Sequence, residues 1–555
     1  MRIQGLLGGQ MRARSGVDLV GRERRGVKTL RLIVAGVLVN GILLSPAWLL
    51  AGRIGQPVLA AEALVLVAVF ALLPARRWAR VLALVAGATV VTVAFVGFGE
   101  TGTRLALARP LNLYLDFWLL RSVWHLLVGS LGPVMAAALT LTAPLLVLAV
   151  VLLLAFLLTP RPFEEMALTG RLSALALVAV ASAGLSAGRL PALADVVQAP
   201  AWRLLVGQAR VFRDMSAERE RFADALARSP DSYRAVPGLL SRLAGRDVVL
   251  GFIESYGETV LTDARYRPVV GPRLDDLAGR AAAAGLRIVS GTLVAPTQGG
   301  QSWFSHGSLL SGVWLDNQLR YDMLLASGRE TLIDDFRRAG HETVALMPAI
   351  TMPWPEGERF GYDRVLARKD IDYEGPPLNW VTMPDQFTWS YLQKSILDGS
   401  EGPVFAEIGL ISSHAPWTPI LTVLDDWEGI GDGAVFARWE GAGEVPEELW
   451  LDTERVREHY AMSVGYAVHA MASYAERYVD DSVLLIALGD HQPAPLITGD
   501  DASWSVPVHV ISGDAALVEP FLEWGFVEGA WPDPRAEALG MDHFRDWFVR
   551  AYSRP

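Results

Sequence analysis

Side chains that can bind a metal ion or act as a nucleophile follow four short segments of the sequence. Glu254 and His414 each come after an apolar run that is typical of a buried strand. Asp490 and His491 follow a third apolar run at a glycine turn, and Ser302 follows a glycine-rich stretch at a predicted helix start. A carboxylate oxygen and an imidazole nitrogen held at one turn suit Mn²⁺, Zn²⁺ or Mg²⁺. The Asp490–His491 pair therefore predicts a metal site.

A purely structural explanation is open for three of these residues. Taken alone, Glu254 is explained by an ion pair or a cap, and His414 by a structural histidine. A serine at a helix start usually caps the helix. The same position would also expose the Ser302 hydroxyl beside backbone N–H groups and the positive end of the helix, which favours a phosphoryl group on that oxygen.

Apolar runs and helical stretches alternate from Asp247 onward. This alternation predicts an α/β domain with a mixed, largely parallel sheet, in which active residues gather at strand ends. The predicted strands are Val248–Ile253, Leu286–Val294, Thr343–Met347, Val404–Ile411, Val483–Leu488 and Val506–Ile511. The predicted helices are 274–285, 326–339 and 453–479. We place this catalytic domain at 246–555, after a connector with helices at 191–245.

The chain before residue 190 has the composition of a membrane domain. Of the 555 residues, 52% are hydrophobic and only 20% are charged, and the hydrophobic residues gather in this part. Stretches long enough to cross a bilayer core of about 30 Å occur near 32–51, 58–75, 81–98, 134–158 and 172–190. We therefore expect an α-helical transmembrane region of about five spans at 32–190.

The segment 111–131 has the length of a sixth span. Asp116 and Arg121 would lie on different faces of such a helix, so at least one would face lipid or need a partner on another helix. We interpret the segment as an interfacial or partly buried helix, with a sixth span as the alternative.

Charge predicts the orientation of the membrane region. The tail 1–31 carries eight basic and two acidic residues immediately before an apolar run, so the positive-inside rule makes it cytoplasmic. Five spans then place the catalytic domain outside the cytoplasm, and six place it inside. Basic residues in the predicted cytoplasmic loops favour five.

Composition also excludes several classes of partner and ligand. Cysteine is absent, so disulfides and thiolate ligands are excluded and any metal must be bound by oxygen and nitrogen. The net charge of −11 repels phosphate backbones, which argues against nucleic-acid binding.

Together these residues resemble the alkaline phosphatase and sulfatase superfamily. The resemblance is greatest to its membrane-anchored group, which includes lipoteichoic acid synthases and phosphoethanolamine transferases. It covers 246–515 by motif and the whole chain by layout. The resemblance implies a metal ion on four residues, Glu254, Ser302, Asp490 and His491. It also implies that Ser302 is the nucleophile, that His414 contacts the phosphoryl group, and that Arg364, in 361–364, binds substrate.

What the resemblance implies is a phosphotransferase of a bacterial inner membrane. A phosphorus-linked head group would pass from a lipid-linked donor, through a phosphoserine, to an envelope glycan or lipid acceptor. The divalent ion would be Mn²⁺ or Zn²⁺ ahead of Mg²⁺, because an imidazole takes part.

Three alternative functions stay open. With water as acceptor, the chain would be a membrane-bound phosphatase or phosphodiesterase. A sulfatase-like hydrolase is the second alternative, although Phe304 and His306 stand where formylglycine formation needs Pro or Ala, and Arg. A catalytically silent sensor or scaffold is the third, and it is disfavoured because all four core positions keep competent residues.

Overall fold

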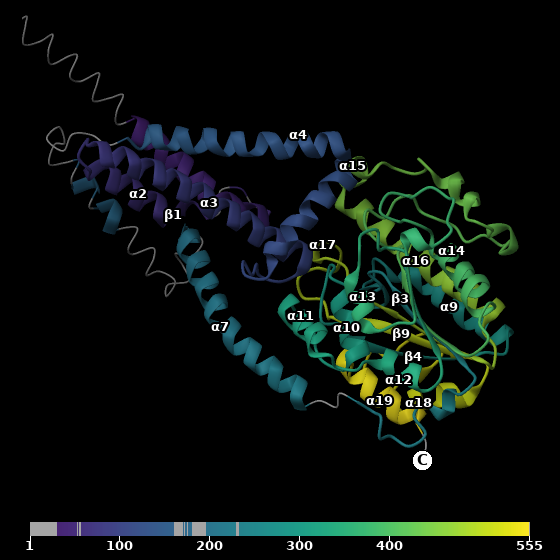
Figure 1. Cartoon of the computed structure of the whole chain (residues 1–555). Helices are drawn as coiled ribbons and strands as arrows, with labels where there is room; N and C mark the ends of the chain where they lie inside the picture. The colour runs from purple at the N-terminus through teal and green to yellow at the C-terminus, as the bar shows by residue number, and fades with distance from the viewer. Residues whose placement is uncertain are drawn as a thin grey trace, which may run out of the picture. The chain divides into compact units, whose positions relative to one another are not determined.

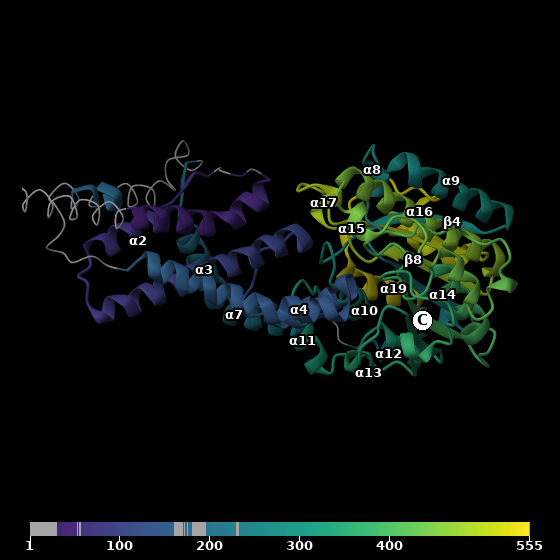
Figure 2. The same ribbon diagram turned by 90° about the horizontal axis from the view of Figure 1, so that it is seen from above.

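The computed structural model describes residues 30–52, 54, 57–159, 170, 172–174, 176–179, 196–228 and 232–553 (Figure 1 and Figure 2). The chain forms two compact units. One comprises Met1–Arg104 and Pro110–Asp214, and the other comprises Leu105–Arg109 and Met215–Pro555. The second unit carries every residue that the sequence proposes for catalysis.

The described part of the chain contains three helices that are long and apolar enough to cross a membrane. They are Leu30–Ala51, Arg77–Leu107 (α3) and Leu131–Leu157, the last forming most of α4 (Leu119–Leu157). A shorter apolar helix, α2 (Ala61–Leu72), lies where the span 58–75 was predicted. The predicted span 172–190 falls mostly outside the described residues. Three candidate spans are therefore found, and the predicted number of five is not confirmed.

The ambiguous segment 111–131 forms a 3₁₀ turn at Asp116–Trp118 and then the first part of α4. Gly132, at φ 76°, breaks α4 and separates this first part from the long apolar part. The helix before the break is about 20 Å long at 1.5 Å per residue, which is short for a bilayer core. Asp116 is 7% exposed, and its carboxylate accepts the Asn112 N–H at 2.8 Å. This first part of α4 is not among the candidate spans of the described residues.

The connector is mostly helical, as its pattern predicts. Its helix α7 runs from Pro200 to Arg228 and includes the charged run of the sequence. A short strand before it, β2 (Val197–Gln198), pairs in parallel with β1 (Leu59–Ala60).

The second unit is built on a mixed sheet that has nine strands within the described residues. The strand order is β10-β4-β9-β8-β3-β7-β5-β6, and β11 pairs with β4. The core from β8 to β6 is parallel, whereas β9 runs antiparallel to both β8 and β4. The strands are β3 (Asp247–Ile253), β4 (Arg287–Val294), β5 (Glu342–Met347), β6 (Arg364–Ala367), β7 (Val404–Leu410), β8 (Val483–Gly489), β9 (Ser505–Ser512), β10 (Val527–Glu528) and β11 (Leu539–Gly540). The predicted largely parallel core is confirmed.

Helices cover both faces of this sheet. They are α8 (Thr259–Thr262), α9 (Arg267–Ala283), α10 (Trp303–Ser311), α11 (Gln318–Ser327), α12 (Leu332–Arg338), α13 (Pro355–Phe360), α14 (Asp385–Tyr391), α15 (Pro446–Leu449), α16 (Thr453–Tyr478), α17 (Pro495–Thr498), α18 (Ala515–Glu523) and α19 (Phe544–Tyr552). The prediction of one helix at 326–339 was wrong. Gly328, at φ 65°, ends α11, and the Thr331 N–H donates to Asp334 Oδ2 at 2.9 Å where α12 starts.

The alternation of side chains along β3 explains the two layers. Leu250 and Phe252 point into a core that includes residues of α10, α12, α18 and α19. Val249 and Ile253 point into the opposite core, with α9 and α16. Figure 1 shows α9 and α16 on one side of the strands and α12, α18 and α19 on the other. Because β3 is buried on both faces from Val248 to Ile253, this part carries no charged residue, and the acidic residues stand at its two ends, Asp247 and Glu254.

Candidate active site

Strand register brings two of the proposed metal ligands together. Ile253, the last residue of β3, pairs with Leu410 of β7 on one side and Gly489 of β8 on the other. Glu254 and Asp490 are the next residues of neighbouring strands, so they emerge side by side at the carboxyl edge of the sheet. A Cβ at Gly489 would lie 1.9 Å from the Tyr256 carbonyl oxygen, so this close approach requires glycine.

The structure gathers Glu254, Asp490 and His491 into one cluster. One potential ligand atom from each lies within 4.8 Å of the other two. The Nε2 atom of His491 is 3.4 Å from Asp490 Oδ2 and 3.6 Å from Glu254 Oε1. The other ring nitrogen, Nδ1, lies 2.9 Å from the Gln492 carbonyl oxygen, which can only accept a hydrogen bond. Nδ1 therefore carries a proton, and in the neutral ring Nε2 would present its lone pair toward the two carboxylates.

Two observations fit a cation at this position. His491 Nε2 is buried and has no hydrogen-bond partner among the described residues. Asp490 Oδ1 accepts the backbone N–H groups of Ser255 and His491 at 2.8 and 2.7 Å, which leaves Oδ2 facing the imidazole. A buried acceptor nitrogen beside two carboxylates is unfavourable unless a positive ion satisfies all three.

Three ionisable side chains are buried close together in the cluster, and this shifts their pKa values. Burial and, second to it, the neighbouring Glu254 carboxylate raise the pKa of Asp490 to about 6. For Glu254, burial acts to raise the pKa, but His491 and His414 outweigh it and the pKa falls below its usual value. For His491, burial acts to lower the pKa, but the two carboxylates outweigh it and raise the pKa. A bound cation would relieve the repulsion between the carboxylates.

Ser302 reaches the cluster through a loop that is tied to the residues after His491. Gln298 forms a bridge with Gln492, and the Gly299 N–H donates to the Gln492 carbonyl at 2.8 Å. Gln301, directly before the serine, has φ 65°, a strained conformation of the kind that recurs at functional sites. This loop delivers Ser302 to the N-terminus of α10.

The Ser302 side chain does not cap α10. It makes no capping hydrogen bond, although it occupies the N-cap position. Instead its hydroxyl acts on Asp490, where it helps to lower the pKa of that carboxyl. The capping explanation that the sequence left open is therefore disfavoured, because the hydroxyl faces the proposed ligands.

The structure brings His414 near the cluster but not Arg364. His414 is among the charges that lower the pKa of Glu254, and its ring lies 6.2 Å from that of Trp380. Arg364 begins β6 and pairs with Glu342 at 3.3 Å, at the amino ends of β5 and β6. In the sheet register it lies in the row of Val249, about 16 Å before Glu254 at 3.3 Å per residue.

The structure also shows three site neighbours that the sequence analysis did not single out as site residues. His306 lies one turn after Ser302 on α10, and its Nδ1 is 2.7 Å from Glu407 Oε1. Glu407 also accepts a hydrogen bond from Tyr362. The available signal was the glutamate itself, a charged residue within the apolar run of β7. Its partners are distant in sequence and were not readable from that run.

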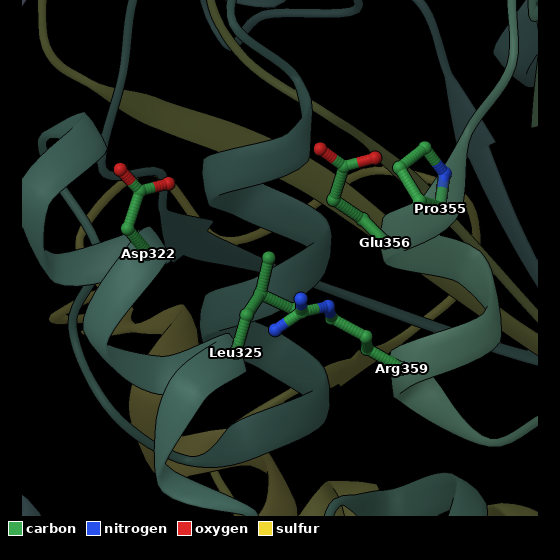
Figure 3. Close-up of a pocket in the computed structure, with 5 residues that line it drawn as sticks. All are labelled: Asp322, Leu325, Pro355, Glu356 and Arg359. Carbon is green, nitrogen blue, oxygen red and sulfur yellow. The ribbon is translucent and has the colours of Figure 1, made fainter.

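A separate hollow lies between α11 and α13. Figure 3 shows its lining residues, Asp322, Leu325, Pro355, Glu356 and Arg359. None of them belongs to the cluster around His491. The hollow has two carboxylates and one guanidinium, and we assign it no function.

Among known proteins, the chain is similar to several solved structures. No family model matches the chain, and no curated protein matches it. The chain is similar to the lipooligosaccharide phosphoethanolamine transferase A of Neisseria meningitidis, with a TM-score of 0.48, 12% identity and 95% of both chains covered. It is also similar to the lipoteichoic acid synthase LtaP of Listeria monocytogenes, with a TM-score of 0.36 and 13% identity over 60% of this chain and 78% of that chain.

A third similar structure is an alkaline phosphatase superfamily protein of Vibrio parahaemolyticus, with a TM-score of 0.36 and 13% identity. This match covers 61% of this chain and 75% of that one. The three identities are 12–13% and the three TM-scores are below 0.5. The function is argued below from the chain's own residues.

Proposed function

We propose that this chain is a membrane-anchored, metal-dependent phosphotransferase. It moves a phosphorus-linked head group from a lipid-linked donor to an envelope glycan or lipid acceptor, through a phosphoserine at Ser302. The observation that carries the proposal is that two side-chain atoms, Ser302 Oγ and His491 Nε2, both lie beside Asp490. The Ser302 hydroxyl leaves its helix uncapped and turns to Asp490, and His491 Nε2 is buried there without a hydrogen-bond partner among the described residues.

The proposed metal ligands are Glu254, Ser302, Asp490 and His491. Carboxylate oxygens with one imidazole favour Mn²⁺ or Zn²⁺, with Mg²⁺ as the third choice. When bound, a divalent ion supplies Lewis acidity that favours the ionised form of a coordinated hydroxyl.

In the proposed reaction Ser302 Oγ attacks the donor's phosphorus in line with the leaving alcohol. The Oγ–P bond forms, the bond from phosphorus to the donor lipid breaks, and the serine proton ends on the oxygen of the leaving alcohol. The N-terminus of α10, which is the positive end of the helix dipole, favours the phosphoryl oxygens there. His414 is a second proposed contact to the phosphoryl group. Arg364 has no role here, because its guanidinium pairs with Glu342 away from the cluster.

A second attack then releases the group from Ser302. An acceptor hydroxyl forms the new bond to phosphorus and the Oγ–P bond breaks, so the serine is restored. A lipid-linked donor is favoured because the apolar helices hold the protein in the bilayer, where such a donor is concentrated. With water as acceptor, the same residues would perform a phosphatase or phosphodiesterase reaction. A sulfatase-like hydrolase is the remaining alternative.

The direct test is the mass of the Ser302 peptide. The purified, metal-loaded protein is incubated with total membrane lipid, quenched, digested and analysed by mass spectrometry. We expect a mass increase on the peptide that contains Ser302, and the size of the increase names the transferred group. Loss of the adduct when a glycan fraction is added would support a transferase over a hydrolase. Donor consumption without any adduct at Ser302 would contradict the proposal.

We further propose that the catalytic domain faces away from the cytoplasm, as five spans require. The chain has no cysteine, so a single introduced cysteine is its only thiol. Ser395 is exposed on the second unit and is a suitable reporter, and Ser15 lies in the basic tail. We expect a membrane-impermeant maleimide to label Ser395→Cys in intact cells and Ser15→Cys only after lysis. Protection of Ser395→Cys until lysis would mean a cytoplasmic site and would exclude envelope acceptors.

A further inference from the structure

The loop that delivers Ser302, which we call the nucleophile loop (297–301), packs against a segment from much earlier in the chain. That segment is Leu105–Arg109, which belongs to the second unit and includes the last three residues of α3. A Cβ at Gly299 would lie 1.7 Å from the Ala106 carbonyl oxygen, so the two backbones touch and the loop needs glycine there. The end of α3 is therefore part of the surroundings of the proposed nucleophile.

The backbone of the nucleophile loop adopts an unfavourable conformation. Gly299, Gly300 and Gln301 have φ values of 74°, 143° and 65°. Glycine adopts positive φ without a steric cost, whereas glutamine does not, and such a residue keeps this conformation only where its surroundings hold it. Gln301 is bonded directly to Ser302, so the conformation of Gln301 helps to determine where the serine hydroxyl lies.

Arg109 contacts the side chain of this strained residue. Its Nε and Nη2 atoms lie 3.4 and 3.3 Å from Gln301 Oε1, so one edge of the guanidinium faces the amide oxygen. Ala108, directly before Arg109, has φ 52° just after the end of α3, and the chain turns there. The contact joins residues 192 positions apart and is therefore made by the fold and not by the loop alone.

Other contacts hold the rest of the nucleophile loop. The Thr297 hydroxyl donates to the Gly300 carbonyl at 2.7 Å, and a Cβ at Gly300 would lie 3.6 Å from Leu107 Cδ2. These contacts fix the residues before Gln301. The guanidinium of Arg109 acts on Gln301 itself, and hydrogen bonds from a charged donor are stronger than neutral ones.

We propose that Arg109 is a positioning residue for the nucleophile, because its guanidinium holds Gln301 at positive φ. This conformation directs the Ser302 hydroxyl toward Asp490. The inference rests on the proposed phosphotransferase function. Arg109 exchanges no proton and forms no bond to phosphorus; it keeps Ser302 Oγ in line for the attack. The site would thus include a residue that the sequence analysis places in the transmembrane region, well before the predicted catalytic domain.

The first test is a double-mutant cycle of Arg109→Ala and Gln301→Ala in the full-length, metal-saturated protein. We expect each change to lower kcat by roughly 10- to 10²-fold, as for a small misplacement of a reacting group, and to leave the KM for the donor within about twofold. The combined variant should be no worse than the weaker single variant, because either change removes the same contact. Arg109→Lys should recover part of the loss, because its ammonium still donates a charged hydrogen bond.

Two control variants accompany the cycle. Arg104→Ala removes an arginine of the same helix that pairs with Glu100 at 2.6 Å, and it should keep the wild-type kcat. Gly299→Ala should lower kcat, because its Cβ would meet the end of α3. Gly328→Ala controls for strain alone, because Gly328 also has positive φ, 65°, but open space where its Cβ would lie.

Three results would overturn the inference. The first is a kcat of Arg109→Ala within about twofold of the wild type. The second is additive losses in the cycle, because Arg109 would then not act through Gln301. The third is a raised KM with an unchanged kcat, because Arg109 would then bind the donor instead of positioning the nucleophile.

A cross-link tests the contact without any activity measurement. The chain has no cysteine, so Arg109→Cys and Gln301→Cys together introduce its only two thiols. We expect a short bismaleimide to link their peptides in isolated membranes, as detected by mass spectrometry. Arg109→Cys with Ser395→Cys is the control and should not be linked, because Ser395 precedes β7, whose amino end lies at the edge of the sheet opposite the site. Absence of the Arg109–Gln301 link would overturn the inference.

These measurements separate the inference from the proposed function. If the wild type neither consumes donor nor forms phosphoserine, the proposed function fails, and the cross-link still decides whether the end of α3 meets the nucleophile loop. If the wild type turns over and the Arg109 variants match it, only the inference fails.

Discussion

Ser302→Ala is expected to lower donor turnover by at least roughly 10³-fold, because the missing oxygen is the proposed attacking atom. The fold should be unchanged, since the hydroxyl makes no capping bond to α10. The measurements are the rate of donor consumption, the adduct mass on the Ser302 peptide, and the thermal unfolding midpoint. We expect no adduct and an unfolding midpoint close to that of the wild type.

Ser305→Ala is the matched control for this substitution. Ser305 lies on the same helix and is fully buried, and its hydroxyl has no hydrogen-bond partner among the described residues. Its loss should therefore leave turnover unchanged and should not destabilise the protein. Ser308 is a poorer control, because its hydroxyl accepts the Leu315 N–H at 2.9 Å. Turnover of Ser302→Ala above a few per cent of the wild-type rate would refute the nucleophile role.

The sequence predicted the strands that position the site because a strand that is buried on both faces consists of apolar residues. The strands β3, from Val248 onward, and β8 are packed on both faces, so they are apolar runs, and the acidic residue directly after each run marks the strand end. This rule located Glu254 and Asp490, which the register of β3 and β8 then brings together. The rule did not locate β6, because that strand is short and three of its four residues are only half-buried.

Contacts between residues far apart in the sequence could not be predicted from apolar runs and the residues that follow them. Arg364 was selected from a local motif, and a motif does not say at which end of a strand its arginine lies. The His306–Glu407 pair joins residues 101 positions apart, through a helix and a strand whose docking depends on the whole core. Which ring nitrogen of His491 faces the carboxylates could not be predicted either, because this depends on the position of the Gln492 carbonyl.

The count of membrane spans shows a different limit. Apolar length alone predicted a span at 58–75, yet the helix there, α2, extends only from Ala61 to Leu72. The strand β1 takes Leu59 and Ala60 out of the helix by pairing with β2, a partner far along the chain. Long-range pairing thus shortened a segment that hydropathy treats as continuous.

Glu254→Gln and Asp490→Asn are each expected to weaken metal binding by more than about 100-fold, beyond the effect of losing an outer-shell partner. Each change removes one charge from a cluster that has two carboxylates and one imidazole, while keeping the shape of the side chain. The measurements are metal content by elemental analysis and metal affinity of the stripped protein. Glu258→Gln is the matched control, because this nearby glutamate lies outside the cluster and should keep its metal.

The affinity of the metal-free wild type should also depend on pH in a defined direction. Burial, together with Glu254, raises the pKa of Asp490 to about 6, so this carboxyl binds a proton as the pH falls through 6. A proton there competes with the metal, and the raised pKa of His491 acts in the same direction. We therefore expect full affinity well above pH 6 and a loss of roughly tenfold or more per pH unit below it. Asp490→Asn should flatten this dependence, because the competing proton site is gone.

Active protein without metal, or equal metal loss in Glu258→Gln, would contradict the assignment of these ligands.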